Sequence, residues 1–512
     1  MVIWPTKRRA TTRRWILGEA TISATGPELI ELITAWTSAE RNLNLPIGTG
    51  VRESLLHASE LRRQVAANGQ LSLDLNDPGK SADLLYAVCR ILEEGCADSP
   101  ETTLRDAAAF RKFVDGIRWS EDEFGEREGL LCALTFICWR SARILGLSLA
   151  ANRWEFEYRR VLQGSLDWEG TQEAWVTHRW SPAELSVRLP VEGEDLLRIL
   201  LYLQDRSEYR PEVVASNSIT LYDYLRSANS LPSDVHSYLL GTAARIGGST
   251  LGTTGRLEEA AKWIGIAEAH FRSGVDPEPQ LARVLFHRLR ILYEIGRVDL
   301  VAQFAPSLDR QFADFGMDED RVKCRILWSA SLKTAGRPEH ALEILDPVRE
   351  VASCISSHLY GWVLQESGDL RQICGDFTRG REELMEAGSI FKKSSQLTGL
   401  ANVNSIIAAG YRAQGKLAEA IGTFRASKGI YACLGMKTYE AYVEILIAET
   451  YLAMGCHREA EREILKALPS IEEQGMIADA VAAVSILREA VRRRNLDPQV
   501  LREVTERLRP QK

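Results

Sequence analysis

The chain has 512 residues, of which 45% are hydrophobic and 26% are charged, with a formal net charge of −7. This composition is typical of folded proteins, and the acidic balance gives no overall attraction to nucleic acid. The longest apolar run, Gly129 to Trp139, is shorter than the roughly 20 residues that cross a bilayer. Nine widely spread cysteines, an odd number, predict a cytoplasmic protein without a disulfide framework.

Residues 1–45 are predicted to form an N-terminal arm and a helix, Pro27 to Arg41. No apolar segment follows the basic cluster between Lys7 and Arg14, which argues against a secretory signal. Basic clusters can contact phosphates, but near a chain end a solvated arm is the simpler expectation. No helix-turn-helix pattern is visible in residues 46–115. We therefore expect no direct nucleic-acid binding.

Residues 46–165 read as an N-terminal helical region. Apolar residues recur at helical spacing between Ser81 and Glu94. Ser120 and Glu123 form a capping box, and the helix that it opens should end at Gly146. Residues 166–240 contain tryptophans and prolines that interrupt this periodicity, so they are predicted to be an irregular connecting or capping segment. Short helices are expected there, at 196–203 and 221–228.

Single glycines then recur at a nearly constant interval through the second half of the chain. The steps between them are 41, 40, 39, 40 and 40 residues. The six positions are Gly255, Gly296, Gly336, Gly375, Gly415 and Gly455. Such a constant period indicates a repeat architecture, which offers an extended binding surface.

The clearest repeat surrounds Gly415. A small residue, Ala408, lets the first helix approach its partner, and Tyr411 packs beneath it. The glycine occupies the turn, where a residue without Cβ takes a positive φ at little cost. Ala420 then faces the first helix again, and Phe424 fills the gap to the next repeat. The copy around Gly296 is the weakest.

This pattern resembles the tetratricopeptide repeat (TPR), in which each unit is a pair of antiparallel helices. The period is about 40 residues in place of 34, so either the helices or the loops must be longer. Similar long repeats occur in bacterial peptide-sensing regulators and kinesin light chains. The resemblance implies an all-α fold, a right-handed α-solenoid of TPR-like helical hairpins with an additional N-terminal helical region. The repeat array would span 241–475, with C-terminal capping helices at 476–512.

In this family the first helices line a concave groove. Counting back from each turn glycine predicts a peptide-binding surface whose first three units are basic. Its principal residues are Arg245, Arg283, Arg290, Tyr293, Lys323, Lys333, Asn402 and Arg412. The further candidates are Trp362, Gln365, Asp369, Ser405, Tyr442 and Glu449. Basic and amide side chains suit a peptide or protein segment that is acidic or ends in a free carboxylate. Exposed helix faces also carry such residues without any ligand.

Motifs of catalysis are missing from the sequence. The glycine-rich stretch Gly247 to Gly255 lacks the lysine of a phosphate-binding loop and reads as a flexible inter-helix loop. Cys456 and His457 are adjacent without further metal ligands nearby in sequence. No cofactor or metal is expected. The chain is predicted to be a non-catalytic binding scaffold or receptor. The alternatives are a signal-sensing transcriptional or signalling regulator that acts through its N-terminal region, and an enzyme with an unrecognised N-terminal site.

Overall fold

The computed structural model describes residues 89, 92–93, 95–116, 124–164, 174–181, 184–185, 193–207, 210–227 and 231–473. These residues form helices and turns, with no strand among them. They fall into two compact units. The first contains residues up to Ile291 and the segment 314–317, and the second contains 292–313 and the residues from Asp318 onward. The arm and helix at 1–45, most of the helix at 81–94, the capping box at 120–123 and the helices at 476–512 lie outside the described residues.

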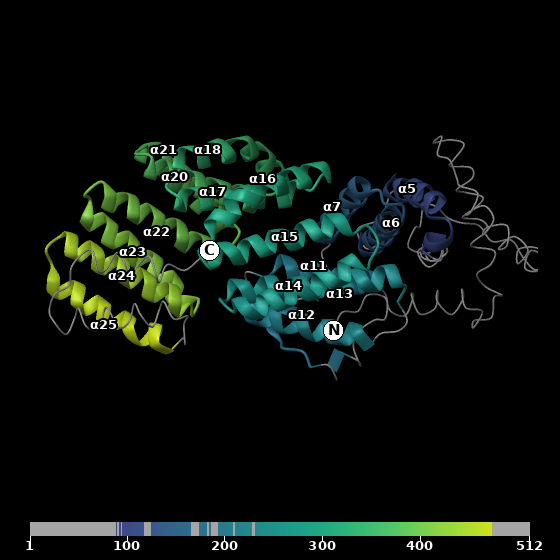
Figure 1. The fold of residues 1–512 in the computed structure, drawn as a ribbon, viewed down its shortest axis with the longest axis horizontal. Helices are drawn as coiled ribbons and strands as arrows, with labels where there is room; N and C mark the ends of the chain where they lie inside the picture. The colour runs from purple at the N-terminus through teal and green to yellow at the C-terminus, as the bar shows by residue number, and fades with distance from the viewer. Residues whose placement is uncertain are drawn as a thin grey trace, which may run out of the picture. The chain divides into compact units, whose positions relative to one another are not determined.

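The helices run in one series from the first unit to the second (Figure 1). Those that begin in the first unit are α5 (Pro100–Gly116), α6 (Phe124–Ile144), α7 (Ser148–Gly164), α9 (Ala174–Thr177), α11 (Gly193–Asp205), α12 (Pro211–Ser227), α13 (Ser233–Thr253), α14 (Leu257–Arg272) and α15 (Pro277–Glu294). The others are α16 (Val298–Asp314), α17 (Asp318–Thr334), α18 (Pro338–Leu345), η3 (Asp346–Val348), α19 (Arg349–Ile355), α20 (Ser357–Ile373), α21 (Phe377–Lys393), α22 (Leu397–Ala413), α23 (Leu417–Cys433), α24 (Lys437–Ala453) and α25 (His457–Glu473).

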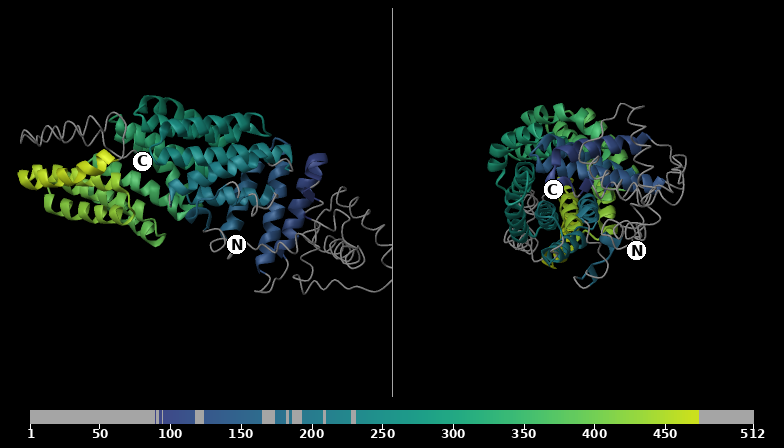
Figure 2. Two further views of the ribbon diagram at one scale, coloured as in Figure 1. Left: turned by 90° about the horizontal axis from the view of Figure 1, so that it is seen from below. Right: turned by 90° about the vertical axis from the view of Figure 1, so that its right-hand side faces the viewer.

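The repeat predicted from the glycines is confirmed. All six turn glycines have a positive φ, between 74° and 91°, and each stands in the turn between two consecutive helices. Helices α20 to α25 pack as three consecutive hairpins, drawn from green to yellow in Figures 1 and 2. The copy around Gly296 belongs to the series, since its φ is 79° and both Val301 and Ala305 are fully buried.

The extra residues of the long period lie in the helices. From α20 to α25 every helix has 17 residues, and every turn between them has three. Two such helices with two such turns make up the 40-residue unit. The helix that follows α17 departs from this pattern, because it is divided into α18, the short 3₁₀ turn η3 and α19. The division occurs at Pro347, which cannot donate a backbone hydrogen bond.

A second set of left-handed residues lies at the turns between hairpins, half a period from the first. It consists of Asp276 (φ 50°), Gly316 (65°), Ser395 (56°) and Gly435 (68°). Only two of the four are glycines, so a search for glycines alone misses the set. At these four turns the chain reverses with a left-handed residue, as it does at the turn glycines, whereas Ser356 between α19 and α20 is extended (φ −160°).

The predicted small residues do bring paired helices together. Ala260, Ala341, Ala408, Ala420 and Ala448 are all fully buried. The glycine-rich segment was predicted wrongly as a flexible loop, because residues 247–253 belong to α13. A Cβ atom on Gly248 would lie only 3.0 Å from Ile264 on α14. These glycines therefore permit helix contact, which explains their place inside a helix.

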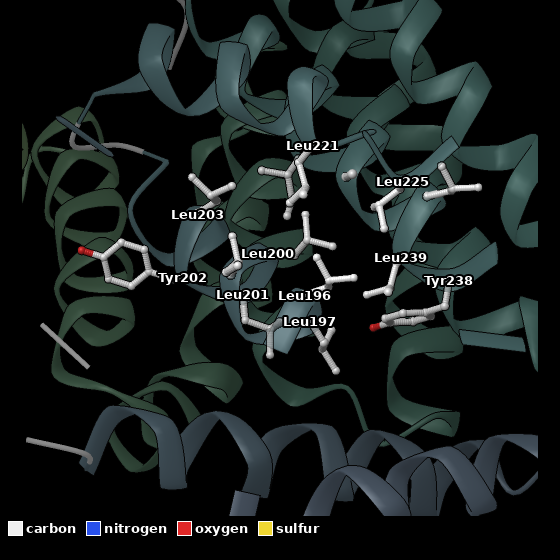
Figure 3. Packing of buried hydrophobic residues seen from close by; sticks show 14 of the residues in the cluster. Leu196, Leu197, Leu200, Leu201, Tyr202, Leu203, Leu221, Leu225, Tyr238 and Leu239 are labelled. Atoms are coloured by element: carbon white, nitrogen blue, oxygen red, sulfur yellow. The ribbon is translucent and has the colours of Figure 1, made fainter. Parts of the chain in front are cut away.

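The connecting segment contains more helix than its tryptophans and prolines predicted. Short helices were expected at 196–203 and 221–228, whereas α11 spans 13 residues and α12 spans 17. Leu196, Leu200 and Leu203 of α11 are fully buried among Leu221 of α12 and Leu239 of α13 (Figure 3). Gly146 follows α6 with a φ of 68°, as predicted for its end. None of the helices in the described ranges combines the length and apolar character needed to cross a membrane.

Candidate functional site

The first and second helices of the last three hairpins differ in burial. No residue between His358 and Gln372 of α20 is fully exposed, and the same holds from Thr398 to Arg412 of α22. The second helices α21 and α23 instead expose residues along their whole length, such as Met385 at 63%. The first helices α20, α22 and α24 are therefore the inner helices of this part of the array.

Half-buried side chains and the buried amide of Asn402 form a stripe on these inner helices, which we call the inner stripe. Its residues are His358, Trp362 and Asp369 on α20, Asn402, Ser405 and Arg412 on α22, and Tyr442 and Glu449 on α24. On α20 the residues are spaced i, i+4, i+11 and on α22 i, i+3, i+10, so on each helix they share one face. Across helices, Trp362, Asn402 and Tyr442 are each one 40-residue period apart. The repeat thus places equivalent positions side by side.

Asn402 is the most clearly oriented polar group of the inner stripe. The Tyr431 hydroxyl on α23 donates a hydrogen bond of 2.5 Å to Asn402 Oδ1. Burial raises the pKa of Tyr431, which keeps this hydroxyl protonated as the donor. This hydrogen bond fixes the orientation of the Asn402 amide. Its oxygen is taken up by Tyr431, and its NH₂ group is the donor for another partner. One turn further along, the hydroxyls of Ser405 and Ser427 lie 2.7 Å apart.

Aromatic rings occupy the equivalent repeat positions on the other two inner helices. The Trp362 ring lies 5.1 Å from the Phe391 ring, and its indole N–H donates to His358 Nε2. Both Trp362 and Tyr442 are half-buried, which leaves part of each ring in contact with solvent. The inner stripe therefore combines flat apolar surfaces with an oriented hydrogen-bond donor.

The cations predicted for this surface are paired with carboxylates of the chain. Lys333 Nζ lies 2.6 Å from Glu366 Oε1 and 2.9 Å from Asp369 Oδ2. Burial alone would lower the pKa of Lys333, but Asp369 and Glu366 outweigh it and raise the pKa. Arg412 forms an ion pair with Glu449 of the next inner helix. The inner stripe is consequently close to charge balance, and less basic than the residue types alone suggested.

Two of the predicted arginines, Arg245 and Arg283, lie in the first unit beside α7. Arg283 Nη1 lies 2.9 Å from Glu155 Oε1 and 3.1 Å from Glu155 Oε2. Arg159 binds the same carboxylate at 3.3 Å. Arg245 donates to Gln204 Oε1 at 2.6 Å and contributes to the positive potential at Glu155. Burial would raise the pKa of Glu155, but Arg283 and Arg159 outweigh it and lower the pKa to about 2.

The predicted residues Arg290, Tyr293 and Lys323 are less buried than Arg245 and Arg283. Arg290 is half-buried and donates to Ser249 Oγ at 3.4 Å, and Tyr293 is half-buried near the end of α15. Lys323 pairs with Glu319 one turn earlier on α17, where its side chain is 40% exposed. Arg245, Arg283 and Arg290 fall in the first unit and the other five predicted residues in the second. The structure therefore describes two separate sets of candidate residues.

Sequence reasoning missed the partners that control these side chains. Glu155 carries no motif, and 128 residues separate it from Arg283. Tyr431 occupies the last turn of α23, where nothing in the repeat pattern marks it as the partner of Asn402. Asp369 and Glu449 were among the predicted residues, yet their role as ion-pair partners follows only from the packing of successive inner helices.

No group of three or more metal-ligating side chains is present in the part of the chain that the structure describes. No family model matches the sequence, and no curated protein matches it either. Among solved structures, a Rap protein complexed with competence and sporulation factor aligns at 12% identity, over 85% of this chain and 100% of its own, with a TM-score of 0.39.

Two further structures align in the same way. Aspartyl phosphate phosphatase F from Bacillus subtilis has 15% identity over 77% of this chain and 95% of its own, with a TM-score of 0.40. A signal transduction ATPase with a tetratricopeptide repeat sensor, from Pyrococcus horikoshii, has 13% identity over 86% of this chain and 65% of its own, with a TM-score of 0.38. Similarities at this level assign neither a ligand nor an activity to the chain.

Proposed function

We propose that the chain is a non-catalytic scaffold that binds a peptide or protein segment across the inner stripe of α20, α22 and α24. The observation that carries this proposal is the regular recurrence of polar and aromatic side chains at one position of successive inner helices. Trp362, Asn402 and Tyr442 stand at the same position of three consecutive hairpins. A ligand that crosses the helices would meet one such residue from each hairpin.

The chemistry of these positions suits an extended peptide. Peptide main chains present carbonyl oxygens at regular intervals, and the oriented NH₂ group of Asn402 is a donor for one of them. Aromatic rings give large contact areas for apolar side chains at a low cost in conformational entropy. Because the ion pairs of Lys333 and Arg412 already balance the charge, we propose that apolar side chains and main-chain groups dominate recognition here.

The test is a selection of short random peptides, displayed with a free C-terminus, on the immobilised full-length chain. Asn402→Asp keeps the oxygen that accepts from Tyr431 but removes the NH₂ donor, and Tyr442→Ala removes one ring. Met385→Ala, on the outer face of α21, is the matched control. Far-UV circular dichroism of each variant verifies that it is folded.

We expect the wild type and Met385→Ala to enrich the same peptides. Asn402→Asp and Tyr442→Ala should each bind those peptides at least about tenfold more weakly, as for residues at the centre of an interface. Unchanged binding by both variants of the inner stripe would remove the ligand from this surface. Failure of the wild type to enrich any peptide would contradict the scaffold proposal itself.

A further inference from the structure

We infer that the first half of α7 uses the Glu155 carboxylate to occupy a site beside Arg245 on α13 and Arg283 on α15. We infer further that the carboxylate of a ligand displaces this part of α7. In this arrangement the Glu155 carboxylate takes the place of an acidic side chain or a C-terminal carboxylate of the ligand. The inference extends the proposed function to the first unit, but it depends on separate residues and is tested separately.

The geometry at Glu155 is that of a bound carboxylate. Both of its oxygens lie within 3.1 Å of Arg283 Nη1, and the Tyr238 hydroxyl donates to Oε2 at 3.3 Å. Arg159 adds a further ion pair from α7 itself. Glu155 is only 3% exposed, so its interactions form away from solvent. Guanidinium groups bind any carboxylate in this way, whether it belongs to the chain or to a ligand.

Polar contacts to turns hold the beginning of α7. The Ser148 hydroxyl donates to Asp276 Oδ1 at 2.5 Å, in the turn between α14 and α15. The Asn152 side-chain amide donates to the carbonyl oxygen of Phe315 at 3.0 Å, within the segment assigned to the first unit. Both acceptors belong to the second set of left-handed turns or lie directly beside it. Water and ligand groups can replace such contacts.

Two large apolar side chains in or next to this half of α7 are exposed to solvent. Leu149 is 62% exposed and Phe156 is 44% exposed, whereas Ala151 is buried and Trp154 packs against the core cluster of the first unit. The second half of α7 differs, because Tyr158 and Leu162 are buried in the large core cluster of the first unit. Release would therefore involve the segment from Ser148 to Glu155 at the cost of the contact between Trp154 and the core, with the later turns of α7 staying in place.

Exchange of one carboxylate for another preserves the charge around Arg283 and Arg245. It avoids the large penalty of leaving a buried cation without its counter-charge, which makes a carboxylate the expected competitor. An amidated or uncharged peptide offers no such replacement. The ligand class assigned to this surface is thus a peptide with acidic side chains or a free C-terminal carboxylate.

The experiment measures amide hydrogen exchange across the full-length chain, together with binding of a fluorescent oligoglutamate peptide that has a free C-terminus. Oligoglutamine with an amidated C-terminus is the control probe. Glu155→Gln removes the internal carboxylate, and Asn152→Ala loosens the same segment without leaving a buried charge. Glu157→Gln is the control variant on the same helix, where the side chain is 25% exposed and pairs with Arg111 and Arg160.

Glu155→Gln and Asn152→Ala should each speed exchange in residues 148–155 by about tenfold and bind more oligoglutamate, with Glu157→Gln unchanged. Oligoglutamate should also speed exchange of this segment in the wild type, and oligoglutamine should not. The inference is overturned if oligoglutamate leaves the exchange of 148–155 unchanged, or if Asn152→Ala remains folded and binds no more probe than the wild type. Loss of peptide binding in the Asn402→Asp variant bears only on the inner stripe of the second unit, so failure of either proposal is recognised independently.

Discussion

Gly368 on α20 and Gly380 on α21 face each other across a close contact between two paired helices. A Cβ atom on Gly368 would lie 2.8 Å from the Gly380 carbonyl oxygen, and a Cβ atom on Gly380 would lie 2.7 Å from the Gly368 carbonyl oxygen. Real Cβ atoms do not approach backbone oxygens this closely. The hairpin therefore requires glycine on both helices at the position that alanine occupies in the later repeats.

This contact predicts that Gly380→Ala destabilises the protein, because the two helices must move apart. The expected loss is about 1–3 kcal/mol in the free energy of unfolding, as for other overpacked sites. Gly422→Ala on α23 is the matched control, since its added Cβ meets no atom within 4 Å. That variant should gain up to about 1 kcal/mol from helix propensity. Chemical denaturation followed by circular dichroism measures both, and equal stability of the two variants would contradict the packing described.

Substitutions in the two sets of turns should have opposite effects on stability. Ser395→Gly should stabilise the protein by up to about 1 kcal/mol, because serine holds a left-handed conformation there (φ 56°) that glycine adopts without strain. Gly415→Ala should cost about 1–2 kcal/mol, since its φ is 74° although no atom blocks the new Cβ. Thermal unfolding of the two variants provides the comparison. A loss of stability in Ser395→Gly would show that the serine side chain contributes more than the backbone strain costs.

Two predicted binding residues should differ sharply in their structural importance. Lys333→Met leaves Glu366 and Asp369 without their buried counter-charge and should cost roughly 3–5 kcal/mol. Lys323→Met removes only a partly exposed pair with Glu319 and should cost no more than about 1 kcal/mol. Urea denaturation of both variants tests this difference. Similar losses would mean that Lys333 is less deeply paired than the structure indicates.

The free energy of unfolding should depend on pH through the Glu155 carboxyl group. Its pKa is about 2 in the folded chain and ordinarily 4.5, so the folded state favours the ionised form. The resulting stabilisation is complete above pH about 4.5 and is lost as the pH falls through the folded pKa. Glu155→Gln should therefore flatten the decline in unfolding free energy between pH about 5 and 3. Profiles of variant and wild type that stay parallel over this range would contradict the assignment.

The repeat could be predicted from the sequence because its turns constrain residue type. A left-handed turn favours glycine, and close helix contact favours alanine or glycine, so Gly415, Ala408 and Ala420 reveal the hairpin directly. Ser395 and Asp276 adopt the same backbone conformation with side chains present, so they do not reveal their turns. The constant 17-residue helices then explain why the spacing stays near 40 residues.

The candidate site could be predicted only as a helix face. Position within the repeat places Asn402 and Arg412 on an inner helix, but it says nothing about which partner satisfies them. Tyr431 orients Asn402 from another helix, and Glu155 reaches Arg283 from far outside the repeat array. Such contacts depend on how helices pack, which a period in the sequence does not encode. The sequence period therefore predicted a basic surface, whereas the structure shows that many of its cations are paired with carboxylates of the chain.

Photo-crosslinking tests the central claim most directly. A benzoylphenylalanine residue is placed at Tyr442 on the inner helix α24 or at Met385 on the outer helix α21, and each full-length variant is irradiated with the peptides selected by the wild type. The account predicts crosslinking from position 442, competed by unlabelled peptide, and none from position 385. Crosslinking from position 385 alone, or equal crosslinking from both positions, would contradict a ligand on the inner stripe.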